Sequence, residues 1–465
     1  MAKQDHARWA EETFGEAELG DSRRVARLVS VAAAVAERPA GTVPQVFRAS
    51  SEREGAFRLL ENDAVSPEAI KRASFDASSR ACRELSRIYV PVDGSSLTLT
   101  DRALRRELGR VGNTRVKSRG LQVMSALAVD EQGAAIGLLD QRWWARDMKP
   151  KSRRGNDRKC FGKRYLKTET HHWLQVLSNC DDRLHENAPN SRPWYQLDRG
   201  ADCWPIFELA LERDLLFTIR ASHDRRLVGP QGQKLHLRRE LRRQRIVGHY
   251  EVLIPRRGRP PRTARITLRA CRVTVVARTG SKRWQEFTLN AVLAEETARR
   301  GKDRLCWILL TTHSIASREN VRAVVHGYTL RWRIEDFHRT WKRGLCNVEK
   351  NQLHSRNAII KWATILGTVA ARALRLAHLF RTASPDIPAS TEFTEHEIEA
   401  CYILAKKKRD RRKSVLLRDL LALIADLGGF AKKYSGKPPG PTVLGRGLQD
   451  IELLAKALQN MEEMR

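Results

Sequence analysis

The stretch Ile88-Tyr89-Val90-Pro91-Val92-Asp93 is a short apolar run that ends in an acidic residue. Trp194-Tyr195-Gln196-Leu197-Asp198 repeats this pattern later in the chain. Apolar runs of this length predict buried β-strands. In open sheets, chemistry tends to lie where the ends of strands meet loops. Asp93 and Asp198 are therefore the first candidates for a functional site.

The segments around these two runs alternate between strand and helix patterns. Further strands are expected at residues 121–129, 134–139 and 215–221, and helices at residues 169–178 and 205–211. Three strands in series, followed by helix, strand, helix and strand, predict a mixed α/β sheet.

A basic segment interrupts this alternation of strands and helices. Residues 223–303 contain 21 Lys and Arg against 7 Asp and Glu. Strand patterns in this segment lie at residues 250–254, 264–268, 272–277 and 287–293. We interpret the segment as a basic β insertion in the α/β domain. A buried strand resumes at residues 305–311, and a long helix is expected from Asn320 to Lys342.

Both ends of the chain read as helical. Asp21 and Ser22 offer an N-cap to a helix over residues 23–36, whose polar face carries Arg23, Arg24 and Arg27. Such a face suits docking on a duplex, with a solvated face on a packed helix as the alternative. An apolar stripe near the C-terminus fits either an internal core or a dimer face, and it consists of Leu448, Ile451, Leu454, Leu458 and Met461. The predicted divisions are residues 1–70, 71–222, 223–303, 304–382 and 383–465.

The composition narrows the classes of partner. The chain has 465 residues and 41% hydrophobic residues, which is enough to build a sizeable core. Its 86 Lys and Arg against 54 Asp and Glu give a net charge of +32, which indicates a polyanionic partner, most often nucleic acid. The sequence contains neither an apolar stretch of about 18 residues nor an apolar leader, so we expect a cytoplasmic protein without a membrane partner. The eight cysteines form no C-x-x-C pair and read as packing residues.

The helix expected from Asn320 carries four polar side chains at spacings that place them on one face. Tyr328, Arg331, Glu335 and Lys342 are separated by 3, 4 and 7 positions, which places them within about 60° of one another on a helix. This geometry alone fits a surface ion pair between Arg331 and Glu335 equally well.

Glu335 adds a third carboxylate to the two that follow strands. Carboxylates from distant points of one sheet suit Mg²⁺ bound to phosphate, because Mg²⁺ prefers hard oxygen ligands. Two such ions about 4 Å apart can activate an attacking hydroxyl and stabilise a leaving oxygen. Asp202 and Asp336 are alternative candidates for metal ligands, and we rank them below Asp198 and Glu335.

The spacing Tyr328-x-x-Arg331-x-x-x-Glu335 followed by Lys342 resembles the signature of bacterial DDE cut-and-paste transposases of the fourth insertion-sequence family. The similarity covers most of the chain and weakens after residue 380. Further similar runs are Leu19-Gly20-Asp21-Ser22-Arg23-Arg24, Glu54-Gly55-Ala56-Phe57-Arg58, Lys117-Ser118-Arg119-Gly120, Trp143-Trp144, Asp198-Arg199-x-Ala201-Asp202 and Leu289-Asn290-Ala291-Val292-Leu293-Ala294-Glu295-Glu296.

The resemblance implies an α/β, ribonuclease-H-like core of the retroviral-integrase superfamily, interrupted by the β insertion. It also implies an N-terminal helical domain that binds transposon ends and a C-terminal helical region that forms a homodimer in the synaptic complex. The implied activity is excision through a DNA hairpin, followed by strand transfer into target DNA. The implied partner is double-stranded DNA, as inverted-repeat ends and as target, at the bacterial nucleoid.

The resemblance also assigns roles to single residues. Asp93, Asp198 and Glu335 would hold two Mg²⁺ ions, for which Mn²⁺ substitutes. Trp307 would hold a base flipped from the duplex, with a buried aromatic residue as the alternative. The residues expected to contact DNA phosphates are Tyr328, Arg331 and Lys342 beside the cut, and Arg23, Arg24, Arg27 and Arg58 in the N-terminal domain.

Two other functions remain open at this point. One is a metal-dependent nuclease on the same fold, which cuts DNA without joining it. The other is an inactive transposase relic that binds DNA as a repressor. The basic loop over residues 146–167 either follows DNA phosphates or is a solvated loop.

Overall fold

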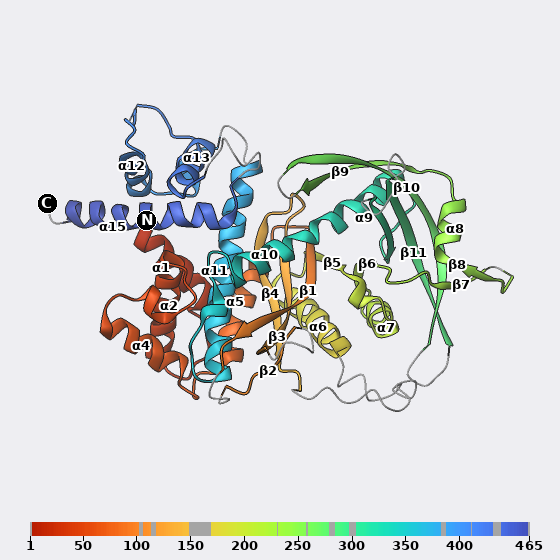
Figure 1. The fold of residues 1–465 in the computed structure, drawn as a ribbon, viewed down its shortest axis with the longest axis horizontal. Coiled ribbons are helices and arrows are strands. Elements are labelled where there is room, and N and C mark those ends of the chain that lie inside the picture. The colour runs from red at the N-terminus through yellow and green to blue at the C-terminus, as the bar shows by residue number, and fades with distance from the viewer. Residues whose placement is uncertain are drawn as a thin grey trace.

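A computed structural model describes residues 2–101, 106–112, 118–147, 169–229, 231–256, 259–278, 284–296, 304–382, 387–410, 412–430 and 439–463. In Figure 1 the N-terminal helices and the C-terminal helices lie at one end of the molecule and the insertion at the other, with the mixed sheet between them. Most of the basic loop, residues 148–167, lies outside the described residues.

The predicted mixed α/β sheet is present. The central strand β1 (Arg87–Leu99) has the antiparallel strand β3 (Arg119–Val129) on one side and the parallel strand β5 (Arg192–Leu197) on the other. Antiparallel strands β2 (Gly109–Arg110) and β4 (Ala135–Trp144) pair with β3, and β6 (Leu216–Arg220) runs parallel to β5.

β1 is longer than its sequence pattern predicted. The strand was expected to end at Asp93, but it continues to Leu99 because β3 stays paired with it up to Arg119. On the other side β5 ends at Leu197, which lies opposite Val92. The ladder between the two parallel strands therefore opens immediately before Asp93.

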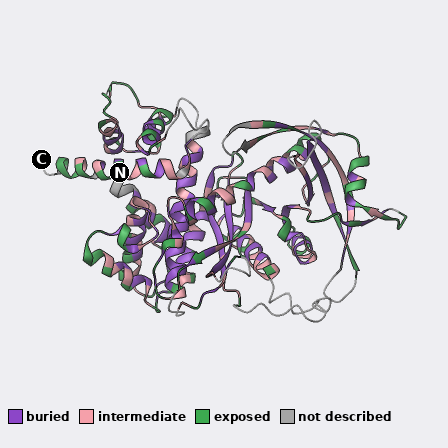
Figure 2. Cartoon of the chain, viewed as in Figure 1, coloured by how far each residue is buried: buried purple, intermediate pink, exposed green. Residues whose placement is uncertain are grey.

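Helices cover both faces of this sheet, and Figure 2 shows the buried residues concentrated there. One face packs against α6 (Glu169–Asn187) and α7 (Trp204–Glu212). The other packs against α5 (Pro67–Arg80), α9 (Arg318–Leu330), α10 (Trp332–Lys342) and α11 (Arg356–Thr382). Side chains alternate along β1, so Val90 and Val92 point to the first face and Tyr89 to the second.

The insertion extends the sheet. β12 (Cys306–Thr311) pairs with β6 and with β11 (Trp284–Glu296), and β11 pairs along thirteen residues with β10 (Arg259–Arg278). β9 (Gly248–Arg256), β7 (Arg226–Val228) and β8 (Lys234–His236) complete a sheet of twelve strands.

One prediction for the insertion was wrong, and one element was missed. Residues 264–268 and 272–277 were expected as separate strands, but they belong to one strand, β10, because β11 pairs continuously across the residues between them. The insertion also contains a helix, α8 (Leu237–Arg243), whose Leu237 and Leu241 are buried against the sheet. Two leucines four positions apart were too short a pattern to stand out among arginines.

The long helix expected from Asn320 to Lys342 is two helices. α9 and α10 meet at Arg331, where the N–H of Arg331 bonds to the carbonyl oxygen of Tyr328 at 3.2 Å and the N–H of Ile334 to that of Arg331 at 3.2 Å. These three-residue spacings tighten the chain for one turn. α9 also passes close to the sheet, since a Cβ atom on Gly327 would lie 2.8 Å from the Tyr89 ring.

The N-terminal helices are α1 (Ala2–Phe14), α2 (Ser22–Glu37), α3 (Val43–Val46) and α4 (Ser50–Leu60). The predicted N-cap is confirmed, because the Asp21 carboxylate accepts a hydrogen bond from the N–H of Arg23 at 2.8 Å. Leu28 and Val35 lie on the buried face of α2, which leaves its arginine-bearing face toward solvent.

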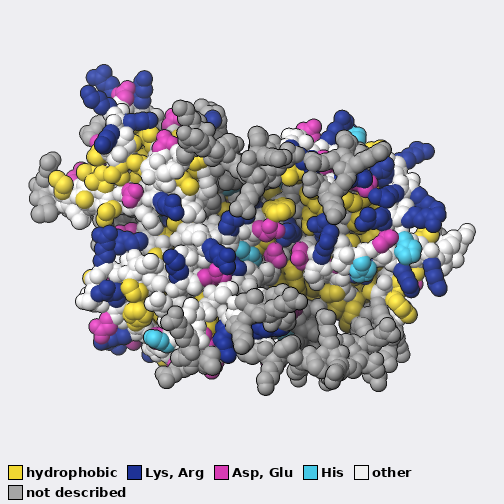
Figure 3. Space-filling model, viewed as in Figure 1, with side chains coloured by type: hydrophobic (Ala, Val, Ile, Leu, Met, Phe, Trp, Pro, Cys, Tyr) yellow, Lys and Arg dark blue, Asp and Glu magenta, His cyan; other side chains and the backbone are white. Residues whose placement is uncertain are grey.

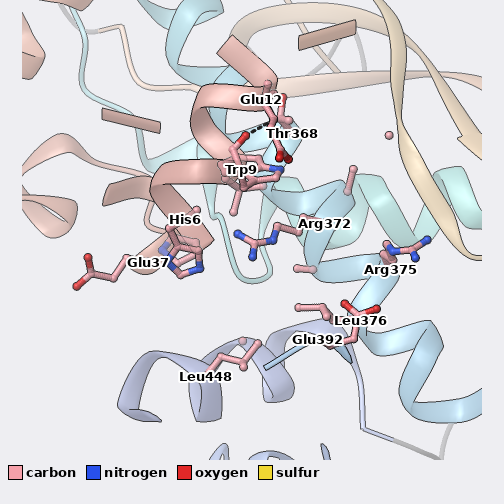
Figure 4. A pocket seen from close by; sticks show the side chains of 18 of the residues that line it. His6, Trp9, Glu12, Glu37, Thr368, Arg372, Arg375, Leu376, Glu392 and Leu448 are labelled. Carbon is pink, nitrogen blue, oxygen red and sulfur yellow. Dashed lines mark hydrogen bonds between the residues drawn. The ribbon is translucent and has the colours of Figure 1, made fainter. Parts of the chain in front are cut away.

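The C-terminal helices α12 (Glu395–Leu404), α13 (Leu417–Leu427) and α15 (Pro441–Glu463) enclose a core of their own. Ile451 of the apolar stripe is buried in this core, Leu448, Leu454 and Leu458 pack against it, and Met461 is exposed. A cavity of about 430 Å³ lies where α1, α11 and α15 approach one another, and the Arg372 guanidinium is 5.2 Å from the Trp9 ring centre. Figure 4 shows the side chains around it.

Two sequence expectations concern the described residues as a whole. None of the helices described is long and apolar enough to cross a membrane. The seven described cysteines are free and mostly buried, which is the packing role predicted for them.

Candidate active site

The two acids that follow apolar runs occupy neighbouring positions on adjacent strands. Val92 pairs with Leu197 in the parallel ladder, so Asp93, the next residue of β1, lies beside Asp198, the first residue after β5. Neighbouring strands lie about 4.8 Å apart. Side chains alternate between the two faces of a strand, so Asp93 lies on the same face as Tyr89, and the position of Asp198 continues the face of Trp194. Tyr89 and Trp194 pack on the side of α9 and α10, so both acids face these helices.

Local hydrogen bonds fix one oxygen of each acid. Asp198 caps a short 3₁₀ turn, η3 (Arg199–Ala201), and its Oδ1 accepts a hydrogen bond from the N–H of Gly200 at 2.7 Å. Asp93 Oδ1 accepts a hydrogen bond from the N–H of Gly94 at 2.8 Å. The second oxygen of Asp93, Oδ2, faces Arg331.

The first turns of α10 bring Glu335 and Arg331 over the end of this ladder. Arg331 Nη1 lies 3.2 Å from Asp93 Oδ2, and Arg331 Nη2 contacts Glu335. The Arg331 side chain is only 10% exposed, against 20% for Asp93 and 32% for Glu335. The ion pair between Arg331 and Glu335, which the spacing alone also allowed, is present and belongs to a cluster that includes Asp93.

The pKa of Asp93 reports how close the three carboxylates are. Burial, with a smaller contribution from the negative charges of Asp198 and Glu335, raises this pKa to about 6, against the opposing effects of the Arg331 guanidinium and the Gly94 N–H. The pKa of a carboxyl group rises in this way when like charges share its site. Asp93, Asp198 and Glu335 thus form one electrostatic unit.

Tyr328 and Trp307 are both buried beside this unit. Trp307 is 5% exposed, Tyr328 is 3% exposed, and their rings meet edge to face at 5.3 Å. Burial raises the pKa of Tyr328, with Arg331 and Arg220 opposing the rise. The structure thus has Trp307 in the buried setting named as the alternative, and base holding stays a prediction.

Lys342 lies at the far end of α10 and points back to β1. Its Nζ is 3.2 Å from Ser95 Oγ and 3.8 Å from Glu349 Oε1. Glu349 also accepts hydrogen bonds from Arg343 Nε at 2.8 Å and from the N–H of Thr98 at 3.0 Å. Burial lowers the pKa of Lys342, and Glu349 partly offsets this effect.

Sequence reasoning missed two residues of this region, Arg220 and Glu349. Arg220 ends β6, the next parallel strand after β5, and the signal available was its place after an apolar run. Glu349 lies in a short 3₁₀ turn, η4 (Val348–Lys350), beyond the helix pattern, so nothing in the sequence pointed to it.

The rival acids have other partners. The Asp202 side chain is fully buried and accepts hydrogen bonds from Arg225 Nε at 2.7 Å and from the Ser222 N–H at 2.6 Å. Asp336 pairs with Arg339 at 2.8 Å and with Arg333 at 3.5 Å. Both carboxylates are engaged in holding local structure.

The donor set suits a divalent cation. The charges of Asp198 and Glu335 both raise the pKa of Asp93, so the three carboxylates are near one another, and carboxylate oxygens are the ligands that Mg²⁺ prefers. Within the described part of the chain, no three His, Cys, Asp or Glu side chains are yet gathered closely enough to coordinate one ion. Arg331 lies between Asp93 and Glu335 and keeps them apart.

The N-terminal arginines lie on the outer surfaces of α2 and α4. Arg23 pairs with Asp21 at 3.3 Å, and Arg24 donates to the carbonyl oxygen of Leu19 at 3.0 Å. Arg27 is exposed on α2, and Arg58 is exposed on α4, where it contacts Glu54. On the face seen in Figure 3, other Lys and Arg side chains gather over the insertion, at the right of the view.

Three family models match the chain. Residues 6–65 match a model described as transposase DNA-binding, and residues 167–371 match one described as transposase DDE domain. The latter range holds Asp198 and Glu335 but begins after Asp93. The chain is a DDE transposase. Residues 368–461 match the transposase Tn5 dimerisation domain, so the transposase also carries a dimerisation region of that type.

Proposed function

We propose that this transposase binds the inverted-repeat ends of an insertion sequence, excises the element through a DNA hairpin and joins it to target DNA. Its relatives would be the transposases of the fourth insertion-sequence family, and above all that of the kanamycin-resistance composite transposon. The observation that carries the proposal is the register that makes Asp93 and Asp198 neighbours, with Glu335 near enough to raise the pKa of Asp93.

Asp93, Asp198 and Glu335 would hold two Mg²⁺ ions, with Mn²⁺ as a substitute. Bound there, the ions would activate the attacking hydroxyl and stabilise the leaving oxygen. A ribonuclease-H-like core is supported by three antiparallel strands continued by two parallel strands, with two of the acids at the open end of the parallel ladder.

The remaining residues of the site would position DNA. Lys342 and Arg331 offer cations on either side of Glu335, and Arg220 interacts with Tyr328, which lies near enough to Asp198 to feel its charge. Trp307 would stack on a flipped base once the Tyr328 ring gives way, with stacking worth about 1–3 kcal/mol. Catalysis would then consist of holding phosphates in place and neutralising their charge.

The division of labour along the chain follows the expected boundaries. Residues 1–70 would recognise the end through the exposed arginines of α2 and α4, and residues 383–465 would pair two subunits in a synaptic complex. The catalytic residues come from segments 71–222 and 304–382, which flank the insertion of residues 223–303. The support is the exposure of these arginines and the separate core of the C-terminal helices.

The experiment is cleavage of a labelled duplex that carries the element's own end, with Mg²⁺, Mn²⁺ or EDTA. Wild type should nick at the element boundary and then form a hairpin, only with metal. Asp93→Asn should bind the duplex and leave it uncut. Arg339→Ala is the matched control, since Arg339 lies on α10 but is exposed and pairs with Asp336.

The same assay separates the other functions. Cutting without joining to a second DNA would indicate a nuclease, and metal-independent binding without cutting would indicate a relic. Trp307→Ala should slow the hairpin step more than the first nick. Equal slowing of both steps would remove the base-holding role.

A further inference from the structure

Arg331 occupies the centre of the acid cluster. Its guanidinium reaches Asp93 with Nη1 at 3.2 Å and Glu335 with Nη2, while its third donor, Nε, is buried without a hydrogen-bond partner. The side chain is 10% exposed and lies 5.8 Å from the ring centre of Trp332, which is half exposed. Arg331 thus lies between the acids and is not extended toward solvent.

The charges of the cluster are unbalanced. Three carboxylates share the site, and one guanidinium lies directly against two of them. Arg331 therefore relieves part of the repulsion, and it takes up oxygen lone pairs of Asp93 and Glu335 that a divalent cation would need. A cation and Arg331 compete for the same oxygens.

A DNA phosphate offers Arg331 an anionic partner other than the two carboxylates that it contacts. Guanidinium matches phosphate with two parallel hydrogen bonds, and the unsatisfied Nε supplies a donor for such a pair. Lys342, held near Ser95 on the same strand as Asp93, adds positive charge that draws a phosphate to this end of the sheet.

We infer that Arg331 is the internal counter-ion of the acid cluster, competing with the metal for Asp93 and Glu335 until a DNA phosphate draws it away. This inference rests on the proposed role of the three acids as metal ligands. Its consequence is that DNA and metal bind cooperatively: each raises the affinity for the other by the same factor, typically about 5- to 150-fold for coupled sites. The transposase therefore loads metal poorly until it holds an end.

The test is Mn²⁺ binding at equilibrium without DNA, followed by the EPR signal of free Mn²⁺. Arg331→Ala should bind Mn²⁺ about tenfold more tightly than wild type, because the competing cation is gone. Arg331→Lys should lie between them, and Arg339→Ala should match wild type. An affinity in Arg331→Ala equal to or below that of wild type would overturn the inference.

A second measurement needs no change at Arg331 and so does not depend on the folding of that variant. Adding the end duplex should tighten Mn²⁺ binding to wild type about tenfold, with the Asp93→Asn complex as the blank for Mn²⁺ held by the DNA itself. Folded Arg331→Ala should show no such gain. Unchanged Mn²⁺ affinity of wild type on DNA would refute the coupling.

The two proposals fail in different ways. If Asp93→Asn binds Mn²⁺ as well as wild type does, the acids are not the metal ligands and the proposed function loses its site. If Asp93→Asn binds Mn²⁺ weakly while Arg331→Ala gains nothing, the acids keep their role and only the competition by Arg331 is wrong.

Discussion

Asp198 and Asp202 lie close together in sequence, yet their surroundings differ in every respect. Asp202 is fully buried and fully matched, with Arg225 and Ser222 supplying its hydrogen bonds. Asp198 is partly exposed, receives one N–H bond from Gly200 and shares its surroundings with Asp93. A carboxylate whose partners balance its charge holds structure, whereas a group of carboxylates with surplus charge is poised to bind a cation.

The sharpest test of this contrast is Asp198→Asn. Cleavage should fall by more than about 100-fold, which is the loss reached even when only the outer shell of a metal site is disturbed. The folded state should persist, because Asp198 contributes one hydrogen bond to a surface turn. Cleavage rates and thermal melts on the same preparation check both statements, and substantial residual cleavage would remove Asp198 from the site.

Asp202→Ala should do the opposite. This change leaves the Arg225 guanidinium, which is 6% exposed, without its carboxylate partner. The free energy of unfolding should therefore fall by about 3–5 kcal/mol. The fraction that stays folded should still cut DNA. Chemical denaturation measures the loss, and a variant as stable as wild type but unable to cut would make Asp202 a catalytic acid instead.

The pH dependence of stability tests the crowding of carboxylates around Asp93. The pKa of Asp93 is about 6 in the folded state against an ordinary value of 3.8, so the folded state holds its proton more tightly. Its contribution to stability is present below pH 3.8 and is lost as the pH rises through 6. The wild type should lose up to about 3 kcal/mol over this window.

Asp93→Asn removes the titrating group, so this variant should show a smaller loss between pH 4 and 7. Urea denaturation without metal at both pH values gives the comparison. A wild type that becomes more stable by the same amount as the variant over this range would contradict the crowding of the three carboxylates.

The smallest effect is expected at the N-terminal helices, where the charges are exposed. Arg27→Ala should weaken binding of the end duplex several-fold and reduce the salt dependence of binding by about one ion, the change expected on losing one phosphate contact. The melting temperature should stay the same. If binding is unaffected at every salt concentration, Arg27 does not contact the end.

Much of the site could be predicted from short patterns. Apolar runs ending in acid located Asp93 and Asp198, because strand register then makes them neighbours. The N-cap at Asp21 was equally local. The length of β1 and the unbroken β10 could not be predicted, since β3 and β11 set them from distant parts of the chain.

The place of Arg331 shows where helix geometry alone fails. Spacing put Tyr328, Arg331, Glu335 and Lys342 on one face, but it did not show that the helix would break at Arg331. Nor did it show that the guanidinium would turn to Asp93, a contact that depends on how closely α9 and α10 approach β1. Tertiary packing decides both.

The continuity of the sheet has a mechanical consequence. β12 ties the insertion to β6 through direct backbone pairing, and the β10–β11 ribbon then runs on without interruption through thirteen residue pairs. Within the described residues, backbone pairing runs without a break from β10 through β11 and β12 to β6. A force on the insertion, such as the pull of bound DNA, would therefore be transmitted along hydrogen-bonded strands to the sheet that carries Asp93 and Asp198.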